Sequence, residues 1–332
     1  MSRLNVAVIG AGAMGRNHAR VYSDMESVNL VAVCDANKKT AKDVADNYNA
    51  NHYDDYKEMI KKEKIDAVSV CVPTKFHKDV AVEIIRNKIN VLVEKPIAAT
   101  IEEANEIMAE AEKNKVKLMV GHIERFNPVV VELKKRIEKN ELGKIYKVHC
   151  VRLSPFPQRV VDVGVIVDLA VHEIDILRYI IGSGVTRVYA ETAQRIHSTH
   201  EDLLTGTLRF ENDILGVINT NWLTPKKVRE ITVTGEKGMF AANYLTQELC
   251  FYENEFTRKN LDYNSNLMNV AEGNIKKIKI DKKEPLMVEL GAFIDCIKKD
   301  TEPTVTGQDG VEALKIAEKF KQSAKEKNVI TL

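Results

Sequence analysis

The sequence has 332 residues, which is enough for about two domains with cores of their own. Its net charge is +1, so charge alone gives no reason to expect binding to nucleic acid or to an acidic membrane surface. No apolar run has the length of a membrane span, and the five cysteines lack the spacing of a metal site. With no signal peptide at the start, we expect a cytoplasmic protein with buried thiols.

The first third of the chain alternates apolar runs with helical patterns. Strands are predicted at 5–9, 30–34, 67–72, 91–93 and 117–120. Helices are predicted at 16–23, 38–48, 54–62, 77–87 and 100–114. Strands that are apolar throughout and alternate with helices indicate a parallel sheet covered on both faces. We therefore predict a doubly wound α/β domain over residues 1–121.

The pattern changes after Gly121. Helices are predicted at 128–140, 165–181, 285–299 and 308–325. Short segments with period-two alternation lie at 187–193, 205–210, 214–219, 227–234, 239–245 and 249–252. Such segments indicate antiparallel strands in one open sheet, so residues 122–332 are predicted to form an α+β domain with a mainly antiparallel sheet. Residues 253–283 are polar and rich in turn residues, and their sequence supports no assignment.

The first predicted strand ends in the stretch Gly10-Ala11-Gly12-Ala13-Met14-Gly15, which contains G-x-G-x-x-G. The first glycine permits a tight turn, the second lets a pyrophosphate approach the backbone, and the third lets helix and strand pack closely. The pyrophosphate is expected on the N–H groups that open the helix. This makes residues 1–121 a Rossmann-type dinucleotide-binding domain, with cofactor contacts at Gly10, Gly12, Ala13, Met14 and Gly15.

Asp35 follows the second predicted strand, twenty residues after Gly15. A carboxylate at this place accepts hydrogen bonds from an adenosine ribose. Lys38 and Lys39 follow it, but Asp35 would repel a 2′-phosphate at the same site. The sequence therefore predicts NAD rather than NADP.

Two further positions are candidates for catalysis. Lys95 follows a predicted buried strand in Glu94-Lys95-Pro96, and the proline holds it extended, so its side chain is aimed at the cofactor edge. Asp168 and His172 are four residues apart on a predicted helix and share one face. Histidine accepts protons near neutral pH, and a nearby carboxylate orients it. The alternative is a capping aspartate with a histidine satisfied in the core.

These motifs, in this order, resemble the Gfo/Idh/MocA oxidoreductases over nearly the whole chain. The resemblance implies proton transfer and substrate positioning by Lys95 and His172, and cofactor contacts from Thr74, His77 and Glu94. It also implies a homo-oligomer, a dimer or tetramer, built through the C-terminal sheet.

Two longer stretches, residues 121–128 and 154–159, resemble UDP-N-acetylglucosamine 3-dehydrogenases within that family. Arg125 and Asn127 in the first and Arg159 in the second are the expected substrate contacts. Arg125, Arg152 and Arg159 are either surface charges or a bidentate clamp for a diphosphate.

The leading hypothesis is an NAD-dependent dehydrogenase that oxidises a secondary hydroxyl of a nucleotide sugar, with C3 of UDP-N-acetylglucosamine as the expected position. The alternatives are an inositol or other free-polyol dehydrogenase and, in another class, a non-catalytic NAD-sensing protein. No metal is expected, since the cluster from His197 to Asp202 is interpreted as a solvated loop.

Overall fold

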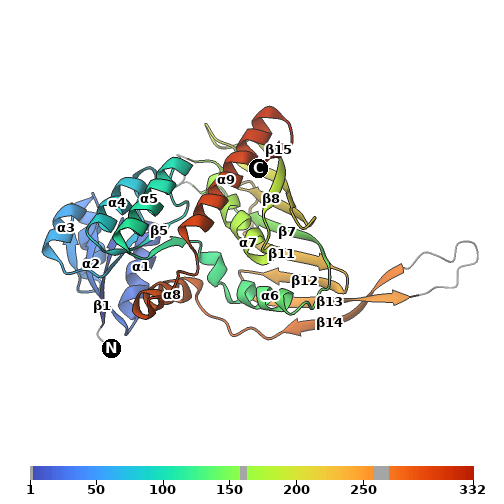
Figure 1. The fold of residues 1–332 in the computed structure, drawn as a ribbon, viewed down its shortest axis with the longest axis horizontal. Helices are drawn as coiled ribbons and strands as arrows, with labels where there is room; N and C mark the ends of the chain where they lie inside the picture. Colours follow the sequence, from blue (N-terminus) through green and yellow to red (C-terminus); the bar gives the residue numbers. More distant parts are fainter. Residues whose placement is uncertain (1–2, 158–162, 258–268) are drawn as a thin grey trace, which may run out of the picture. The chain divides into compact units, whose positions relative to one another are not determined.

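The computed structural model describes residues 3–157, 163–257 and 269–332 (Figure 1). The chain divides into two compact units. The first contains the chain up to Phe126 together with Glu284–Lys315, and the second contains Asn127–Lys283 together with Ile316–Leu332.

The first unit is built on a six-stranded sheet in the order β3-β2-β1-β4-β5-β6, with every pairing parallel. The strands are β1 Leu4–Ile9, β2 Val28–Cys34, β3 Asn51–Tyr53, β4 Ala67–Val70, β5 Asn90–Glu94 and β6 Leu118–Gly121. All four residues of β4 are buried, as expected for a strand covered on both faces. The predicted doubly wound parallel sheet is confirmed.

Helices connect and cover these strands. They are α1 Ala13–Asp24, α2 Lys38–Asp46, α3 Tyr56–Lys62, α4 His77–Arg86 and α5 Ile101–Asn114, with the short turns η1 Thr74–Phe76 and η2 Ile123–Phe126. Thr100 caps α5, since its side chain accepts a hydrogen bond from the N–H of Glu103.

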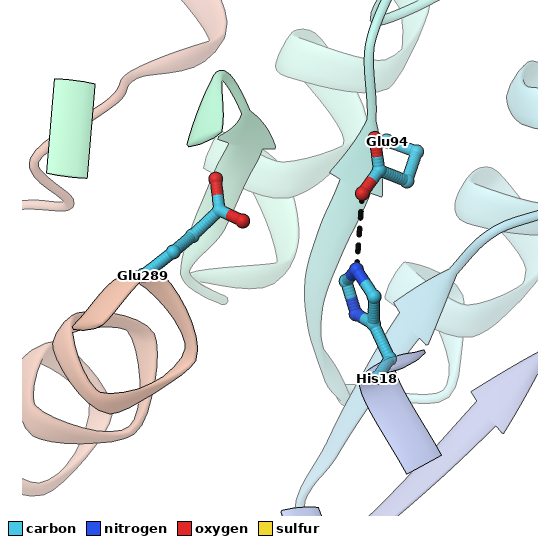
Figure 2. A group of neighbouring side chains, drawn as sticks. All are labelled: His18, Glu94 and Glu289. Carbon is cyan, nitrogen blue, oxygen red and sulfur yellow. Dashed lines mark hydrogen bonds and ion pairs between the residues drawn. The ribbon is translucent and has the colours of Figure 1, made fainter. Parts of the chain in front are cut away.

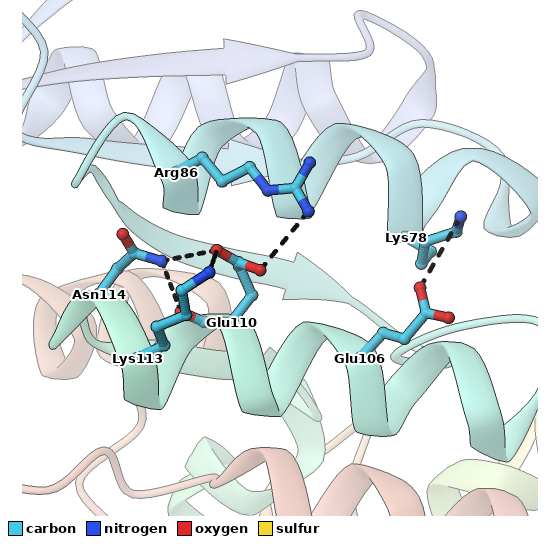
Figure 3. Close-up of polar contacts among 6 residues, drawn as sticks. All are labelled: Lys78, Arg86, Glu106, Glu110, Lys113 and Asn114. Carbon is cyan, nitrogen blue, oxygen red and sulfur yellow. Dashed lines mark hydrogen bonds and ion pairs between the residues drawn. The ribbon is translucent and has the colours of Figure 1, made fainter.

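Polar contacts join the outer faces of α4 and α5 (Figure 3). Glu110 of α5 lies 3.5 Å from Arg86 of α4 and also accepts hydrogen bonds from Asn114. Lys78 and Glu106 form a second, looser ion pair at 3.9 Å. Ion pairs at the protein surface contribute little to stability, so the stability of this layer comes from the apolar core beneath it.

The helix α8, Pro285–Lys299, packs with the first unit although it lies near the end of the chain. Leu290, Phe293 and Ile294 are buried in the same apolar cluster as β1, β4 and β5. The first part of α9, Gly307–Glu326, is grouped with it up to Lys315. The compact units therefore differ from the sequence division into 1–121 and 122–332, because the apolar face of α8 completes the first core.

The second unit contains a nine-stranded sheet in the order β14-β13-β12-β11-β7-β10-β9-β8-β15. Its strands are β7 Ile145–Leu153, β8 Val185–Ala193, β9 Leu203–Phe210, β10 Leu215–Asn221, β11 Val228–Gly235, β12 Gly238–Asn243, β13 Glu248–Thr257, β14 Asn269–Ile278 and β15 Ile330–Thr331. All pairings are antiparallel except that of β7 with β10, which is parallel. The predicted open, mainly antiparallel sheet is confirmed.

One face of this sheet is covered by helices. The helices α6 Pro128–Glu138 and α7 Val171–Ile181 pack on it, and the last part of α9 adds Phe320, whose ring lies against Gly206. On the other face, alternate residues of the central strands, such as His149 and Val217, remain half-exposed.

In the part of the chain that the structure describes, none of the helices combines the length and the apolar character needed to cross a bilayer.

Candidate functional site

The glycine turn between β1 and α1 has the geometry that the motif predicts. Gly10 has φ +92°, and a Cβ on it would lie 2.6 Å from the backbone of Cys71. A Cβ on Gly15 would lie 1.7 Å from the carbonyl oxygen of Gly10. Gly12 is different, because nothing lies within 4 Å of the place of its Cβ. The first and third glycines are therefore required by the fold, while the second leaves the approach to the backbone open.

The start of α1 is suited to an anion. Gly12 is the N-cap residue, and no side chain of the described residues caps the helix or places an acid in its first turn. Ala13 is exposed and Met14 half-buried at the first two helical positions. The first N–H groups of a helix and the positive end of its dipole attract a phosphate group. This end of α1 thus fits the diphosphate of a dinucleotide.

Asp35 lies directly after β2, beside the glycine turn. Its carboxylate accepts hydrogen bonds from the N–H of Ala11 and the N–H of Asn37, both at 2.8 Å. A carboxylate has about four acceptor positions, so half of them remain for ribose hydroxyls. The position of Asp35 fits the expected ribose contact.

His77 connects the ends of two neighbouring strands. The ring is 1% exposed, with Nε2 2.9 Å from the carbonyl oxygen of Val72 and Nδ1 2.8 Å from that of Pro96. Burial lowers its pKa, although hydrogen bonds to the backbone act in the opposite direction. Both ring nitrogens contact the protein itself, so His77 positions the loops after β4 and β5. Thr74, the first residue of the η1 turn, is half-buried beside it.

Glu94 ends β5 and is 7% exposed. Burial alone would raise its pKa, but the hydrogen bond and the charge of His18, together with Lys95, hold the pKa below its ordinary value. The His18 Nε2–Glu94 Oε1 distance is 3.0 Å, and the backbone N–H of Lys95 donates to Glu94 Oε2 at 3.2 Å. Glu94 is therefore an anion that holds the backbone from which the half-buried Lys95 side chain extends.

The same region contains two groups that the sequence did not single out. His18 lies on the buried face of α1, and Glu289 of α8 points toward Glu94 (Figure 2). His18 follows Gly15 by three residues, which is a usable signal for a side chain facing the sheet. Nothing local to Glu289 indicates its place, because its neighbours come from distant segments.

In the second unit, Asp168 lies in the π-helical turn η3, Ile166–Ala170, and His172 in the first turn of α7. Both are half-buried. The predicted helix is present, but its first turn is π rather than α. Glu201 holds this turn by accepting the N–H of Ile166 at 3.2 Å, and its carboxylate lies so close to Gly164 that a Cβ there would be 2.1 Å away. Such π turns occur frequently at functional sites.

The expected substrate contacts Arg125 and Asn127 are both built into the fold. Arg125 is 5% exposed and its Nη2 lies 2.9 Å from Asp309. Burial alone would raise the pKa of Asp309, but Arg125 holds that pKa below its ordinary value. Asn127 is 3% exposed, caps α6 by accepting from the N–H of Val129, and donates to the carbonyl of Tyr244.

Arg152 and Arg159 are the other two candidates for a diphosphate clamp. Arg152 is 4% exposed and is hydrogen-bonded to the buried Glu173, so it is not a surface charge. Arg159 lies outside the described residues.

The segment from His197 to Asp202 is only partly solvated, which corrects the interpretation from the sequence: Ser198 and Thr199 are exposed, but His197 and Asp202 are buried. Asp202 is 0% exposed, and its carboxylate accepts hydrogen bonds from the backbone N–H groups of residues 195, 196 and 197. His197 is 6% exposed, its Nδ1 accepts from two backbone N–H groups, and its ring stacks on Trp222. His197 and Asp202 can be buried because they satisfy the backbone N–H groups of a tight turn.

Comparison with known proteins defines the class. Residues 4–122 match the family described as "Oxidoreductase family, NAD-binding Rossmann fold", and residues 134–332 match "Oxidoreductase family, C-terminal alpha/beta domain". The protein is thus an NAD-dependent oxidoreductase, and it belongs to the Gfo/Idh/MocA family. The predicted family, enzyme class and cofactor are confirmed.

Several characterised proteins are similar to this chain. Myo-inositol 2-dehydrogenase of Thermotoga maritima is 26% identical, over 99% of this chain and 98% of its own. UDP-N-acetylglucosamine 3-dehydrogenase of Acidithiobacillus ferrooxidans is 25% identical over 76% of this chain and 78% of its own. A solved structure of that enzyme superposes with a TM-score of 0.85 at 22% identity, covering 98% of this chain and 99% of its own, which shows a shared fold.

Proposed function

We propose that this protein oxidises a secondary hydroxyl of a nucleotide sugar with NAD, and that the hydroxyl is at C3 of UDP-N-acetylglucosamine. The main support for NAD as the cofactor is the open, uncapped start of α1 beside Asp35. The choice of UDP-N-acetylglucosamine as the substrate is supported by the resemblance of residues 121–128 and 154–159 to UDP-N-acetylglucosamine 3-dehydrogenases. The similarity to the Acidithiobacillus ferrooxidans enzyme also supports it.

In this proposal, residues of this chain bind and orient the substrate and remove its hydroxyl proton. When bound at the start of α1, NAD would supply the acceptor for the hydride that leaves the carbinol carbon, which is chemistry that belongs to the cofactor. His172 removes the hydroxyl proton, and Asp168 orients its imidazole. Lys95 holds the oxygen from which the proton leaves, and Glu94 fixes the backbone of Lys95 through its N–H.

Single substitutions test these roles. Lys95→Ala and His172→Ala should each lower kcat by about 10²–10⁴-fold, the usual contribution of a general acid or base. NADH affinity and melting temperature should stay near those of the parent. Lys57→Ala, which removes an exposed lysine of α3, is the matched control and should leave kcat unchanged. A Lys95 or His172 variant with most of its turnover, under conditions where chemistry limits the rate, removes that residue from the mechanism.

The second candidate is an inositol or other free-polyol dehydrogenase, which the full-length similarity to the Thermotoga maritima enzyme favours. Reduced-cofactor absorbance with a panel of UDP-sugars and inositols separates the two, because only the nucleotide-sugar enzyme requires the diphosphate. Turnover of an inositol with no activity on UDP-sugars would replace the first proposal. Absence of turnover on every substrate, with NADH still bound, favours the non-catalytic NAD-sensing alternative.

We also propose a cytoplasmic homo-oligomer, a dimer or tetramer, assembled through the half-exposed face of the nine-stranded sheet. Half-exposed apolar residues on β7 and β10, among them Val151 and Val217, support this assignment. Light scattering coupled to gel filtration tests it, and a strictly monomeric protein would contradict it.

A further inference from the structure

The buried polar cluster of His18, Glu94 and Glu289 has an unusual composition for a protein core. The three side chains come from α1, β5 and α8 and meet inside the first unit (Figure 2). His18 and Glu289 are 0% exposed and Glu94 is 7% exposed. Two carboxylates and an imidazole therefore share a space from which solvent is excluded.

Glu289 is the member that the protein leaves unsatisfied. Among the described residues, neither of its carboxylate oxygens has a hydrogen-bond partner. Nδ1 of His18 also has none. A buried carboxylate without a partner is strongly unfavourable, and a second carboxylate beside it makes this worse. Burial raises the pKa of Glu289 well above its ordinary value, and the charges of Glu94 and Glu124 raise it further. A cation placed between the carboxyl groups of Glu94 and Glu289 would relieve this repulsion.

The spacing of the three groups fits a single metal ion. One ligand atom from each residue can be chosen so that all lie within 4.8 Å of one another. Two ligands at about 2.1 Å from one ion are separated by about 3.0–3.4 Å, and His18 Nε2 and Glu94 Oε1 are 3.0 Å apart. Because a carboxylate oxygen of Glu289 lies within 4.8 Å of the other two ligand atoms, a movement of its side chain toward them completes the set.

From this geometry we propose that His18, Glu94 and Glu289 bind one divalent transition-metal cation, Zn²⁺ or Mn²⁺. One neutral imidazole and two carboxylates match the ligand preferences of these ions and balance their charge. The ion ties α8 to α1 and to the end of β5. No metal was expected from the cysteine spacing or from the segment His197–Asp202, and these three ligands were not considered, because they lie far apart in the chain.

The test measures metal binding rather than activity. The full-length, tag-free protein is dialysed against EDTA and then titrated with ZnCl₂ or MnCl₂, while metal content and melting temperature are recorded. We expect about one ion per chain and a rise in melting temperature of more than about 3 °C at saturation. Glu289→Gln keeps the side-chain shape and removes one ligand, so it should weaken metal binding at least tenfold.

Glu112→Gln, an exposed position on α5, is the matched control and should bind like the parent. If Glu289→Gln does not fold, His18→Gln provides the second ligand variant. Equal binding by the parent and the ligand variants means surface binding and overturns the proposal. No uptake of either metal, with a melting temperature unchanged by EDTA, also overturns it and leaves Glu289 as a buried neutral acid.

Discussion

The three glycines of the first turn have different physical roles, and alanine substitutions separate them. A methyl group on Gly15 would lie 1.7 Å from the carbonyl oxygen of Gly10, where about 3.2 Å is the closest comfortable approach. The backbone must therefore move by about 1.5 Å. Overpacking costs about 1–3 kcal/mol and more in severe cases, so we take about 3 kcal/mol as the lower bound for Gly15→Ala.

For a domain of this size, each kcal/mol lowers the melting temperature by about 2–4 °C. Gly15→Ala should therefore melt at least about 6–12 °C below the parent. Gly12→Ala meets no atom within 4 Å and loses only the preference of an N-cap for glycine, about 0.5–1 kcal/mol. Its melting temperature should fall by about 1–4 °C.

The affinity for NADH, unlike the melting temperature, should depend more on Gly12 than on Gly15. The methyl group of Gly12→Ala occupies the space through which a diphosphate approaches the start of α1, so its Kd for NADH should rise at least tenfold, or about 1.4 kcal/mol. Thermal melts and NADH fluorescence titrations measure the two effects separately. Gly291→Ala is a control with the same chemical change: it lies inside α8 with Met25 Cε 4.0 Å away, and should raise the melting temperature by about 1–4 °C.

The reasoning would be refuted by a Gly15→Ala protein that melts with the parent, or by a Gly12→Ala protein that binds NADH with the parental Kd. The first result would show that the turn relaxes at little cost. The second would show that the diphosphate does not pass close to Gly12.

Three further predictions concern charged side chains. Asp35→Ser should narrow the preference for NAD over NADP in kcat/KM, because the carboxylate that accepts ribose hydroxyls and repels a 2′-phosphate is gone; an unchanged ratio contradicts this role. Asp309→Asn should lower the free energy of unfolding at pH 7 by about 1.5–3 kcal/mol. The folded-state pKa of Asp309 is lowered, so its contribution to the free energy of unfolding is complete above the ordinary pKa near 4 and is lost as pH falls through the folded-state pKa. In urea melts, the stability difference between Asp309→Asn and the parent should therefore shrink below about pH 4 and stay constant above it. Arg159→Lys should raise KM for a UDP-sugar with a smaller change in kcat, as lost ground-state binding does; equal KM values exclude a diphosphate contact.

Local patterns in the chain were sufficient for most of the parallel sheet, for the helices between its strands and for the cofactor class. Apart from the short β3, which was not predicted, the strands of the parallel sheet are mostly apolar runs. The motif G-x-G-x-x-G places a turn, a helix start and a phosphate site within six residues. The helix Pro285–Lys299 was predicted with the bounds that the structure shows, because its apolar residues repeat along one face. Each of these signals is read between residues a few positions apart.

The strand β7 was not predicted, because its stability depends on neighbours that are distant in the chain. β7 lies at the centre of the large sheet, yet it carries Lys147, His149 and Arg152 and has no simple apolar alternation. Arg152 is accommodated inside because Glu173 of α7 lies against it, and no local pattern shows that pairing. The parallel pairing of β7 with β10 was also missed, since these strands are distant in the chain.

The sequence by itself determined the fold class, the family, NAD as cofactor and the candidates Lys95, Asp168 and His172, because periodicity, turn chemistry and short motifs are local properties. Only the tertiary structure decided that Arg125 is buried against Asp309 and that α8 completes the first core. It alone brought Glu289 to His18 and Glu94. These contacts join residues from distant segments, and the burial that sets their charges and partners exists only after the chain has folded.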